Sequence, residues 1–571
     1  QPVLAVPLFR LAEALPGIGL AHTVWLFNLL VTALTAGVLF AYGMALDYRP
    51  RAAAIVALLY GVGTIAWPYS RTFFREPLFT LLALLSVLLM LRLREALGAG
   101  ERPWGAVIAL AVTFGGALFS KESAFLLLPA LVVQAIPHRL ASGLVARRTA
   151  LTLLAVSTII VALLVIAASA DSLFGVETGR WSVMRRLEQV RANVEQAGEG
   201  ALGYLVSPGR SIWVYSPVLL AGFLGWPWLV RQRRLREIAV PLVMLVTFVV
   251  GYALVRGPEW YGGTGWGPRY LVPATPFLAL WLLPVVERLL EPGASRLGRA
   301  ALAALAAISA GVQAVAVLVP VHSYYELLAQ QSPPVIPWQE GAWSVRWSPL
   351  WMSIDLLGEQ TPDLLAARAL GQAWLLPVLA ILLMLLALVA LAWWLRRRSG
   401  TPRAVLVTAL GLVLATALVL GGGLAAARHD PRYWGDFMPL RDLLAQLAPQ
   451  VRDDDAIVLS DNAYRRFFMN YYKQRTPMIL TLPYSPGKQT SPEAVPPVVS
   501  NDPDALIHPS NTLILADLAQ RHDRLWLITD SSPFVAWANR PVEQYLARHY
   551  FPVREVAGGD LARAVLFDLT N

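Results

Sequence analysis

The sequence predicts a polytopic α-helical membrane protein with a small α/β domain at its C-terminal end. Of its 571 residues, 56% are hydrophobic and only 15% are charged, whereas a soluble domain averages about 25% charged residues. Apolar runs long enough to cross a bilayer recur along most of the chain. After residue 425 the composition changes, and short buried strands alternate with amphipathic helices.

Apolar segments at twelve places in the first part of the chain are predicted to span the membrane. A spanning helix needs about 20 residues, or fewer when flanking side chains snorkel, so the second, third and fifth segments are marginal in length. The predicted spans cover residues 20–42, 52–67, 77–92, 104–120, 124–137, 150–170, 213–230, 238–256, 270–287, 300–320, 372–395 and 404–424.

The basic residues predict which connections face the cytoplasm, because Lys and Arg gather in cytoplasmic loops. The strongest clusters are Arg231–Arg236 and Arg396–Arg398, and the four predicted spans between them allow both to lie inside. The other connections on that side are then also basic, while the long or aromatic-rich ones fall outside. We therefore expect a protein of the cytoplasmic (inner) membrane with an extracytoplasmic C-terminal domain. The net charge of +10 is explained by this topology and does not indicate nucleic-acid binding.

The C-terminal domain, residues 425–571, is predicted to be α/β. Strands are expected at 455–460, 477–482, 525–529 and 564–569, helices at 462–474 and 533–549, and a proline-rich loop at 483–510. The acidic run Asp453–Asp455 is interpreted as a solvated turn. The absence of cysteine excludes disulfides and cysteine-based metal sites, and the seven histidines show no metal-ligand spacing.

The first candidate site is the outer connection Trp67–Pro77, where aromatic residues, arginines and a carboxylate crowd together between two spans. Ionisable groups near lipid are costly and therefore point to function. Glu76 could serve as a general base or a metal ligand. The alternative is a structural ion pair of Glu76 with Arg71 or Arg75.

Two further outer connections carry candidate residues. Lys121, in a tight turn before Glu122, can neutralise a phosphate, or it can snorkel or pair with Glu122. The segment Glu259–Tyr270 has four glycines in six positions, which allow a ligand to approach the backbone closely. Arg269 can bind a phosphate through two hydrogen bonds, and the aromatic side chains offer faces for a sugar. The alternative is a turn within an interfacial aromatic belt.

Together these connections resemble the GT-C superfamily of polyprenyl-phosphate-dependent glycosyltransferases, and more narrowly the branch with the lipid A aminoarabinose transferase and the protein O-mannosyltransferases. The resemblance extends over essentially the whole chain and is carried by Tyr69–Arg71, Glu76–Leu78, Phe119–Glu122, Arg210–Pro217 and Gly265–Pro273. It implies transfer of a sugar from a polyprenyl-phosphate donor to an acceptor lipid, glycan or protein at the outer membrane face.

The resemblance also implies residue roles. Glu76 matches the second acidic position of the family, and its main catalytic acid, with one more span, is expected upstream of Gln1. Lys121, Arg269 and Arg71 are expected at the donor phosphate. No cofactor is required, although a divalent cation at Glu76 stays open. The candidate substrate-binding residues are Tyr69, Glu259, Trp260, Tyr261, Trp266 and Tyr270.

The main alternative is a transporter or flippase of lipid-linked sugars, and another is a catalytically silent membrane protein that binds them. A transporter should carry ionisable groups in mid-span and interrupted half-helices. The apolar segments here show no such interruption, and the charges lie at their outer ends. The sequence therefore favours an enzyme.

Overall fold

The computed structural model describes fifteen stretches of the chain. The chain forms two compact units, of which the first contains residues 1–16 and 22–420 and the second residues 17–21 and 421–571. The described residues are 1–15, 18–101, 103–136, 183–263, 265–329, 331, 335, 340–358, 362–364, 421–425, 438–460, 479–481, 509–530, 541–557 and 562–570.

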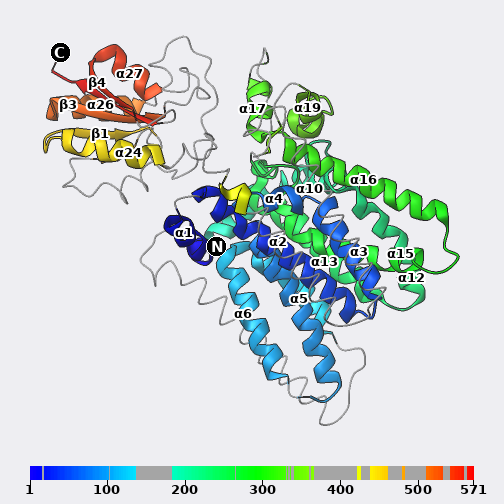
Figure 1. Ribbon diagram of the computed structural model, residues 1–571. Helices are drawn as coiled ribbons and strands as arrows, with labels where there is room; N and C mark the ends of the chain where they lie inside the picture. The colour runs from blue at the N-terminus through cyan, green and yellow to red at the C-terminus, as the bar shows by residue number, and fades with distance from the viewer. Residues whose placement is uncertain are drawn as a thin grey trace. The chain divides into compact units, whose positions relative to one another are not determined.

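The first unit is a helical bundle (Figure 1), and its described residues include five helical stretches long and apolar enough to cross a membrane. The prediction of a polytopic α-helical membrane protein is therefore confirmed. The predicted spans at 150–170 and 372–395, and 404–424 as far as residue 420, lie outside the described residues. The five stretches are α2 (Leu20–Ala45), α5 (Glu76–Gly98), α13 (Leu235–Arg256) with the turn that follows it, Arg269–Leu289, and α16 (Arg296–Leu318).

Several of the predicted spans are interrupted, contrary to the expectation of continuous helices, and two of them are broken at prolines. The predicted span 213–230 consists of α11 (Ile212–Tyr215), the 3-10 helix η2 (Pro217–Gly225) and α12 (Trp226–Arg231). The predicted span 270–287 consists of the 3-10 helix η4 (Arg269–Ala274), α14 (Thr275–Leu280) and α15 (Leu282–Leu289). Prolines cause these breaks, because they remove backbone donors and clash with the preceding helical turn.

Buried serines satisfy backbone groups at the start of η2 and at the break between α3 and α4. The Ser309 hydroxyl accepts from the amide of Val218 at 3.1 Å and donates to the carbonyl of Gly63 at 2.6 Å, and Ser216 accepts from the amide of Ile65 at 3.1 Å. Irregular backbone at membrane depth requires such internal partners. The spans are not continuous, so continuity gives no argument against a transporter. The position of the charges at the ends of the spans is the argument for an enzyme that remains.

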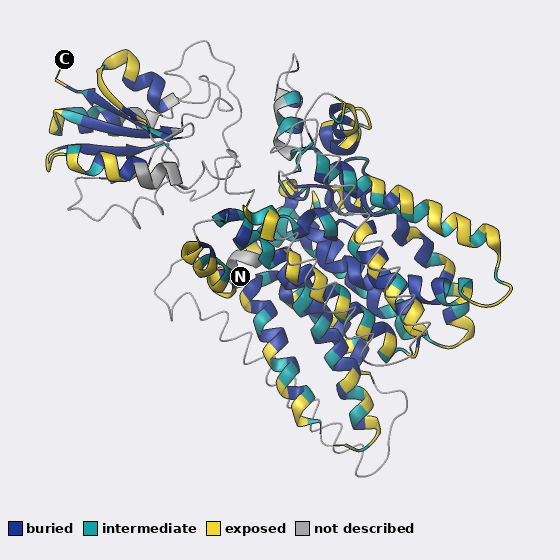
Figure 2. Cartoon of the chain, in the orientation of Figure 1, coloured by how far each residue is buried: buried dark blue, intermediate teal, exposed yellow. Residues whose placement is uncertain are grey.

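The other helices of the first unit connect and flank these spans. One continuous buried core joins most of them, and Figure 2 shows this buried interior with exposed outer faces, for example along α16. These helices are α1 (Pro2–Ala14), α3 (Pro50–Gly63), α4 (Ala66–Ser70), α6 (Trp104–Ser120), η1 (Glu122–Leu127), α7 (Leu128–Ala135), α9 (Val183–Asn193), α10 (Ala197–Val206), η3 (Gly257–Glu259), α17 (Val321–Ala329), α18 (Glu340–Trp343) and α19 (Pro349–Leu356).

The second unit contains a five-stranded mixed sheet with the strand order β2-β1-β3-β5-β4. Strand β1 is parallel to β2 and β3, whereas β5 is antiparallel to β3 and β4. Helix α24 packs on one face of the sheet, and α26 and α27 pack on the other. The elements are β1 (Ala456–Leu459), β2 (Ile479–Thr481), β3 (Arg524–Asp530), β4 (Phe551–Ala557), β5 (Ala562–Asp568), α24 (Met438–Leu447), the short η6 (Ala448–Gln450), α26 (Pro509–Arg521) and α27 (Pro541–His549).

Three features of this unit differ from the sequence prediction. Helix α26, which begins at Pro509 within the predicted loop, was not predicted. Strand β4 was not predicted; it lies at the sheet edge, where Pro552 is tolerated because an edge strand need not donate every hydrogen bond. Asp455 does not belong to a solvated turn. It is fully buried and accepts hydrogen bonds from the indole of Trp526 at 3.0 Å and from Arg524 at 3.2 Å. The predicted helix at 462–474 and most of the predicted loop at 483–510 lie outside the described residues.

Candidate functional site

Glu76 is the centre of a buried charge cluster that joins the three predicted connections. Its Oε1 atom lies 2.8 Å from Lys121 Nζ and 2.9 Å from Arg269 Nε. Only 1% of the Glu76 side chain is exposed, so its single negative charge balances one of two cations within the bundle. Burying a charge is costly unless it is paired and hydrogen-bonded. The sequence predicted all three residues on one side of the membrane, and the structure brings them into direct contact.

Local structure explains why Glu76 points into the bundle. It is the first residue of α5, and Pro77 follows it at a position where the missing amide costs nothing. The fully buried Asn28 of α2 holds the preceding loop, because its side-chain amide donates to the carbonyls of Thr72 at 2.6 Å and Phe74 at 2.8 Å. The entry of the chain into α5 is therefore fixed from a neighbouring helix.

Aromatic rings enclose the Lys121 ammonium. Tyr252 and Tyr270 stack with their centroids 4.6 Å apart, and Lys121 Nζ lies 5.3 Å from the first centroid and 5.2 Å from the second. The Tyr252 hydroxyl donates to Ser123 at 2.7 Å, which fixes the ring. Burial opposes the charge on Lys121, but the adjacent Glu76 carboxylate raises the pKa of Lys121 above its ordinary value. Lys121 is therefore held as a cation.

Arg269 is the most accessible member of the cluster. Its side chain is 25% exposed, compared with 5% for Lys121. The guanidinium carbon lies 3.8 Å from the centroid of Phe74, a stacking contact that suits an arginine. Nε donates to Glu76, and a guanidinium has five N–H donors in all, so the terminal nitrogens have donors for a further ligand. A planar pair of N–H donors of this kind can bind a phosphate through two hydrogen bonds.

Arg210 holds the glycine-rich segment that leads to Arg269. The sequence analysis did not predict this structural role. It is 1% exposed and donates to the carbonyls of Gly263 at 3.2 Å, Gly267 at 3.1 Å and Gly265. Gly267 has φ of +56°, which other residues adopt with difficulty. A signal was present in the sequence, because Arg210 lies in a predicted outer connection and residues 263–267 offer backbone carbonyls without an acidic side chain among them.

The predicted substrate-binding aromatic residues have mainly structural contacts. The Tyr69 hydroxyl donates to the carbonyl of Trp266 at 3.0 Å, and Trp266 packs edge-on against Tyr215. Trp260 is 2% exposed and packs on the backbone of α10, where glycines make room for its ring. Tyr204 donates to the Trp260 carbonyl and contacts its ring edge-on.

The remaining predicted residues lie around this cluster with different exposure. Tyr261 is half-buried against the core, and Tyr270 is buried as one of the two stacked rings beside Lys121. Glu259 is 73% exposed, 4.0 Å from Arg256. The Arg256 guanidinium in turn lies 5.0 Å from the centroid of Tyr270, so a third cation flanks the same aromatic pair.

Arg71, predicted at the donor phosphate, bonds to other parts of the unit. Its guanidinium donates to the carbonyls of Val317 and, at 2.8 Å, Asp363, and it lies 3.5 Å from the Asp363 carboxylate. These contacts connect the turn after α4 to the end of α16. Arg75 instead lies 3.9 Å from the carboxylate of Glu122. Neither arginine forms the predicted alternative ion pair with Glu76.

The described residues contain no cluster of three or more His, Asp or Glu side chains that could hold a metal ion. Glu76 offers one free acceptor, because its Oε2 atom is buried and has no hydrogen-bond partner among the described residues. A divalent cation at Glu76 therefore stays a prediction.

Comparison with known proteins gives two structural neighbours. No family model matches the chain, and no curated protein sequence matches it. The chain is similar to crystal structures of ArnT from Cupriavidus metallidurans, in the apo state and bound to undecaprenyl phosphate. The identities are 15% and 14%, the TM-scores are 0.42 and 0.43, and each alignment covers 96% of this chain and 84% of ArnT.

Proposed function

We propose that this protein is a glycosyltransferase of the cytoplasmic membrane that transfers a sugar from a polyprenyl-phosphate donor to an acceptor hydroxyl at the outer face. The observation that carries the proposal is the pair of cations, Lys121 and Arg269, on the single buried carboxylate of Glu76. The pair retains one uncompensated positive charge at the end of a membrane-spanning helix, where a lipid phosphate would lie. The GT-C resemblance of the three connections supports the same chemistry.

In this mechanism Arg269 binds the donor phosphate directly. The acceptor hydroxyl loses its proton to a base and attacks the anomeric carbon, the bond to the phosphate oxygen breaks, and the phosphate leaves with one more negative charge. Arg269 stabilises that growing charge through its terminal nitrogens, and Lys121 adds a second positive charge from behind Glu76. Fixed cations in a site with little water are effective at such stabilisation.

Glu76 acts in this proposal as a positioning residue. Its Oε1 atom already accepts from both Lys121 and Arg269, which fixes the carboxylate in place. Its role is to aim Arg269 and to keep Lys121 within the bundle. The base of the reaction is therefore a different group. Tyr69 and Trp266, which are hydrogen-bonded to each other, would shape the donor site through the loop that carries Arg269.

The test is transfer of a labelled sugar by the purified protein in lipid nanodiscs. The donor is a polyprenyl-phosphate sugar, and a membrane extract supplies acceptors. We expect transfer by the wild-type protein, loss of transfer with Arg269→Ala, and a large decrease with Lys121→Ala and Glu76→Gln. Arg51→Ala is the matched control, because Arg51 is an exposed arginine on a connection predicted to be cytoplasmic, and it should retain full activity.

Two outcomes would overturn the proposal. One is the absence of transfer together with movement of the labelled lipid across the bilayer of sealed vesicles, which would identify a transporter. The other is equal transfer by wild-type protein and Arg269→Ala, which would remove the phosphate site from the reaction. Unfolding temperatures of all variants, measured in the same nanodiscs, separate loss of chemistry from loss of structure.

A further inference from the structure

A second group of arginines lines a cavity at the other end of the bundle. Helix α5 begins with Glu76 and carries Arg94 and Glu95 in its last turns, roughly 27 Å farther along at about 1.5 Å per residue. Helix α13 likewise has Arg236 in its first turn and Arg256 in its last. The cavity has a volume of about 460 Å³, which lies within the range of small-molecule sites, roughly 300–1,000 Å³.

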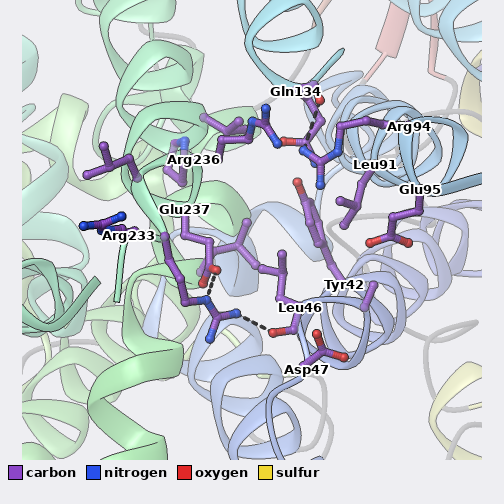
Figure 3. A pocket seen from close by; sticks show the side chains of 16 residues that line it. Tyr42, Leu46, Asp47, Leu91, Arg94, Glu95, Gln134, Arg233, Arg236 and Glu237 are labelled. Atoms are coloured by element: carbon purple, nitrogen blue, oxygen red, sulfur yellow. Dashed lines mark hydrogen bonds and ion pairs between the residues drawn. The ribbon is translucent and has the colours of Figure 1, made fainter. Parts of the chain in front are cut away.

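The walls of this cavity come from four connections that the basic residues assigned to the cytoplasmic side. They are the end of α2, the end of α5, the end of α7 and the turn from α12 into α13. Figure 3 shows Arg94, Arg236 and Gln134 together on one wall, with Asp47 on the opposite side. The structure thus gathers in space the loops that share a predicted side, although they are far apart in the sequence.

Arg94 and Arg236 both contact the end of α7 at this wall of the cavity. Arg94 donates to the carbonyl of Gln134 at 3.3 Å and, among the described residues, makes no ion pair within 4 Å. Arg236 donates to the carbonyl of Ile136. A guanidinium has five N–H donors, so one carbonyl leaves most of those on Arg94 available. Arg94, half-buried at the cavity wall, therefore has donors that can bind an anion in the cavity.

The acidic residues of the cavity are engaged elsewhere. Glu237 accepts from the Tyr48 hydroxyl at 2.7 Å and pairs with Arg234. Glu95 lies 3.3 Å from Arg92 on the outer surface of α5. Asp47 is exposed at the rim. The carboxylates in the cavity wall therefore leave Arg94 without a counter-ion within ion-pair distance.

We propose that this cavity binds a phosphate-bearing anion, either the phosphodiester headgroup of an acidic membrane lipid or soluble phosphate. Leu235, an apolar side chain that is 57% exposed, lines the same cavity as the arginines. Basic pockets between helix ends on the cytoplasmic side are suited to anionic headgroups. The site is separate from the proposed transfer site and does not depend on it.

The experiment measures binding of short-chain phosphatidylglycerol to the full-length protein in neutral detergent. The test variant is Arg94→Gln with Arg236→Gln, and the matched control is Arg51→Gln with Arg288→Gln, which removes the same charge from exposed positions outside the cavity. We expect at least about tenfold weaker binding for the test variant and unchanged binding for the control, because hydrogen bonds to charged groups contribute on that order. Arg94→Lys keeps the positive charge and serves as a control for misfolding. It should lose less affinity for phosphatidylglycerol than the test variant.

Separate arms distinguish the two sources of the anion. Phosphatidylcholine replaces phosphatidylglycerol in one arm, and inorganic phosphate without lipid is used in the other. Binding of phosphatidylglycerol that depends on both arginines assigns a lipid headgroup, and binding of inorganic phosphate alone with the same dependence assigns a soluble anion. The proposal is overturned if neither anion binds, or if the control variant loses as much binding as the test variant.

Discussion

The two ends of the helical bundle use arginine in opposite ways. At the end that holds Glu76, the cations share one fully buried carboxylate and lie against aromatic rings. At the other end, Arg94 and Arg236 bond to backbone carbonyls around an open cavity, and Glu237 is reserved for Arg234 and Tyr48. A buried carboxylate fixes the position of a cation, whereas the single carbonyl partner of Arg94 leaves most of its N–H donors available. We infer that the end with Glu76 holds its cations in fixed positions, as a transfer site requires, and that the end with Arg94 suits reversible binding of an anion.

The largest expected difference between the two ends is in stability. Glu76→Gln leaves Lys121 and Arg269 without their shared counter-ion inside the protein, and we expect a loss of about 3–5 kcal/mol in the free energy of unfolding. The matched change at the other end is Glu237→Gln, which should cost about 1–3 kcal/mol, because Arg234 is 27% exposed and can reach water. Urea unfolding of both variants in the same detergent checks the order. Equal losses would contradict the assignment of Glu76 as the buried centre.

An intermediate effect is expected from the loop that supports Arg269. In Gly265→Ala the added methyl carbon would lie 2.6 Å from the Tyr69 hydroxyl and 3.4 Å from the side chain of Arg269. Overpacking of this kind typically costs about 1–3 kcal/mol, and it should also raise the KM for the donor. Gly61→Ala is the control, since a methyl group there meets no atom within 4 Å. The prediction fails if both variants have the same KM and stability.

The smallest effect is expected from Arg71, the predicted phosphate ligand whose contacts lie elsewhere. Arg71→Ala removes the link to Val317 and Asp363 and should lower the free energy of unfolding by about 1 kcal/mol. Because Arg71 forms no contact with Glu76, Lys121 or Arg269, the KM for the donor should stay the same. A raised KM with unchanged stability would instead return Arg71 to the donor site.

Sequence reasoning reached the charged residues of the site but not their contacts. Charge asymmetry placed Glu76, Lys121 and Arg269 on one side, because loop charge is a property of the chain that needs no structure. Their joining through a single Oε1 atom depends on how α5, α6 and η4 pack, which no local pattern encodes. Trp260 was misjudged for a similar reason: the glycines that receive its ring lie in α10, more than fifty residues earlier.

The fold could be predicted to a similar extent. Hydrophobic length identified the long spans and the strands of the second unit, since burial sets both patterns. The 3-10 segments were missed because membrane-spanning helices tolerate proline. The presence of Pro217 and Pro273 therefore did not by itself predict a break. Edge strand β4 was missed because its exposed residues, beginning with Phe551, carry no alternation of buried and exposed positions.

The most direct test of the central claim is the affinity of the protein for a polyprenyl phosphate that carries no sugar. We predict that Arg269→Ala lowers this affinity at least about tenfold, because it removes charge-assisted hydrogen bonds to the phosphate. Arg94→Gln, at the other end of the bundle, should leave it unchanged. If Arg269→Ala keeps the wild-type affinity and Arg94→Gln loses it, the lipid phosphate binds at the Arg94 end of the bundle. That result would contradict the proposed site of transfer.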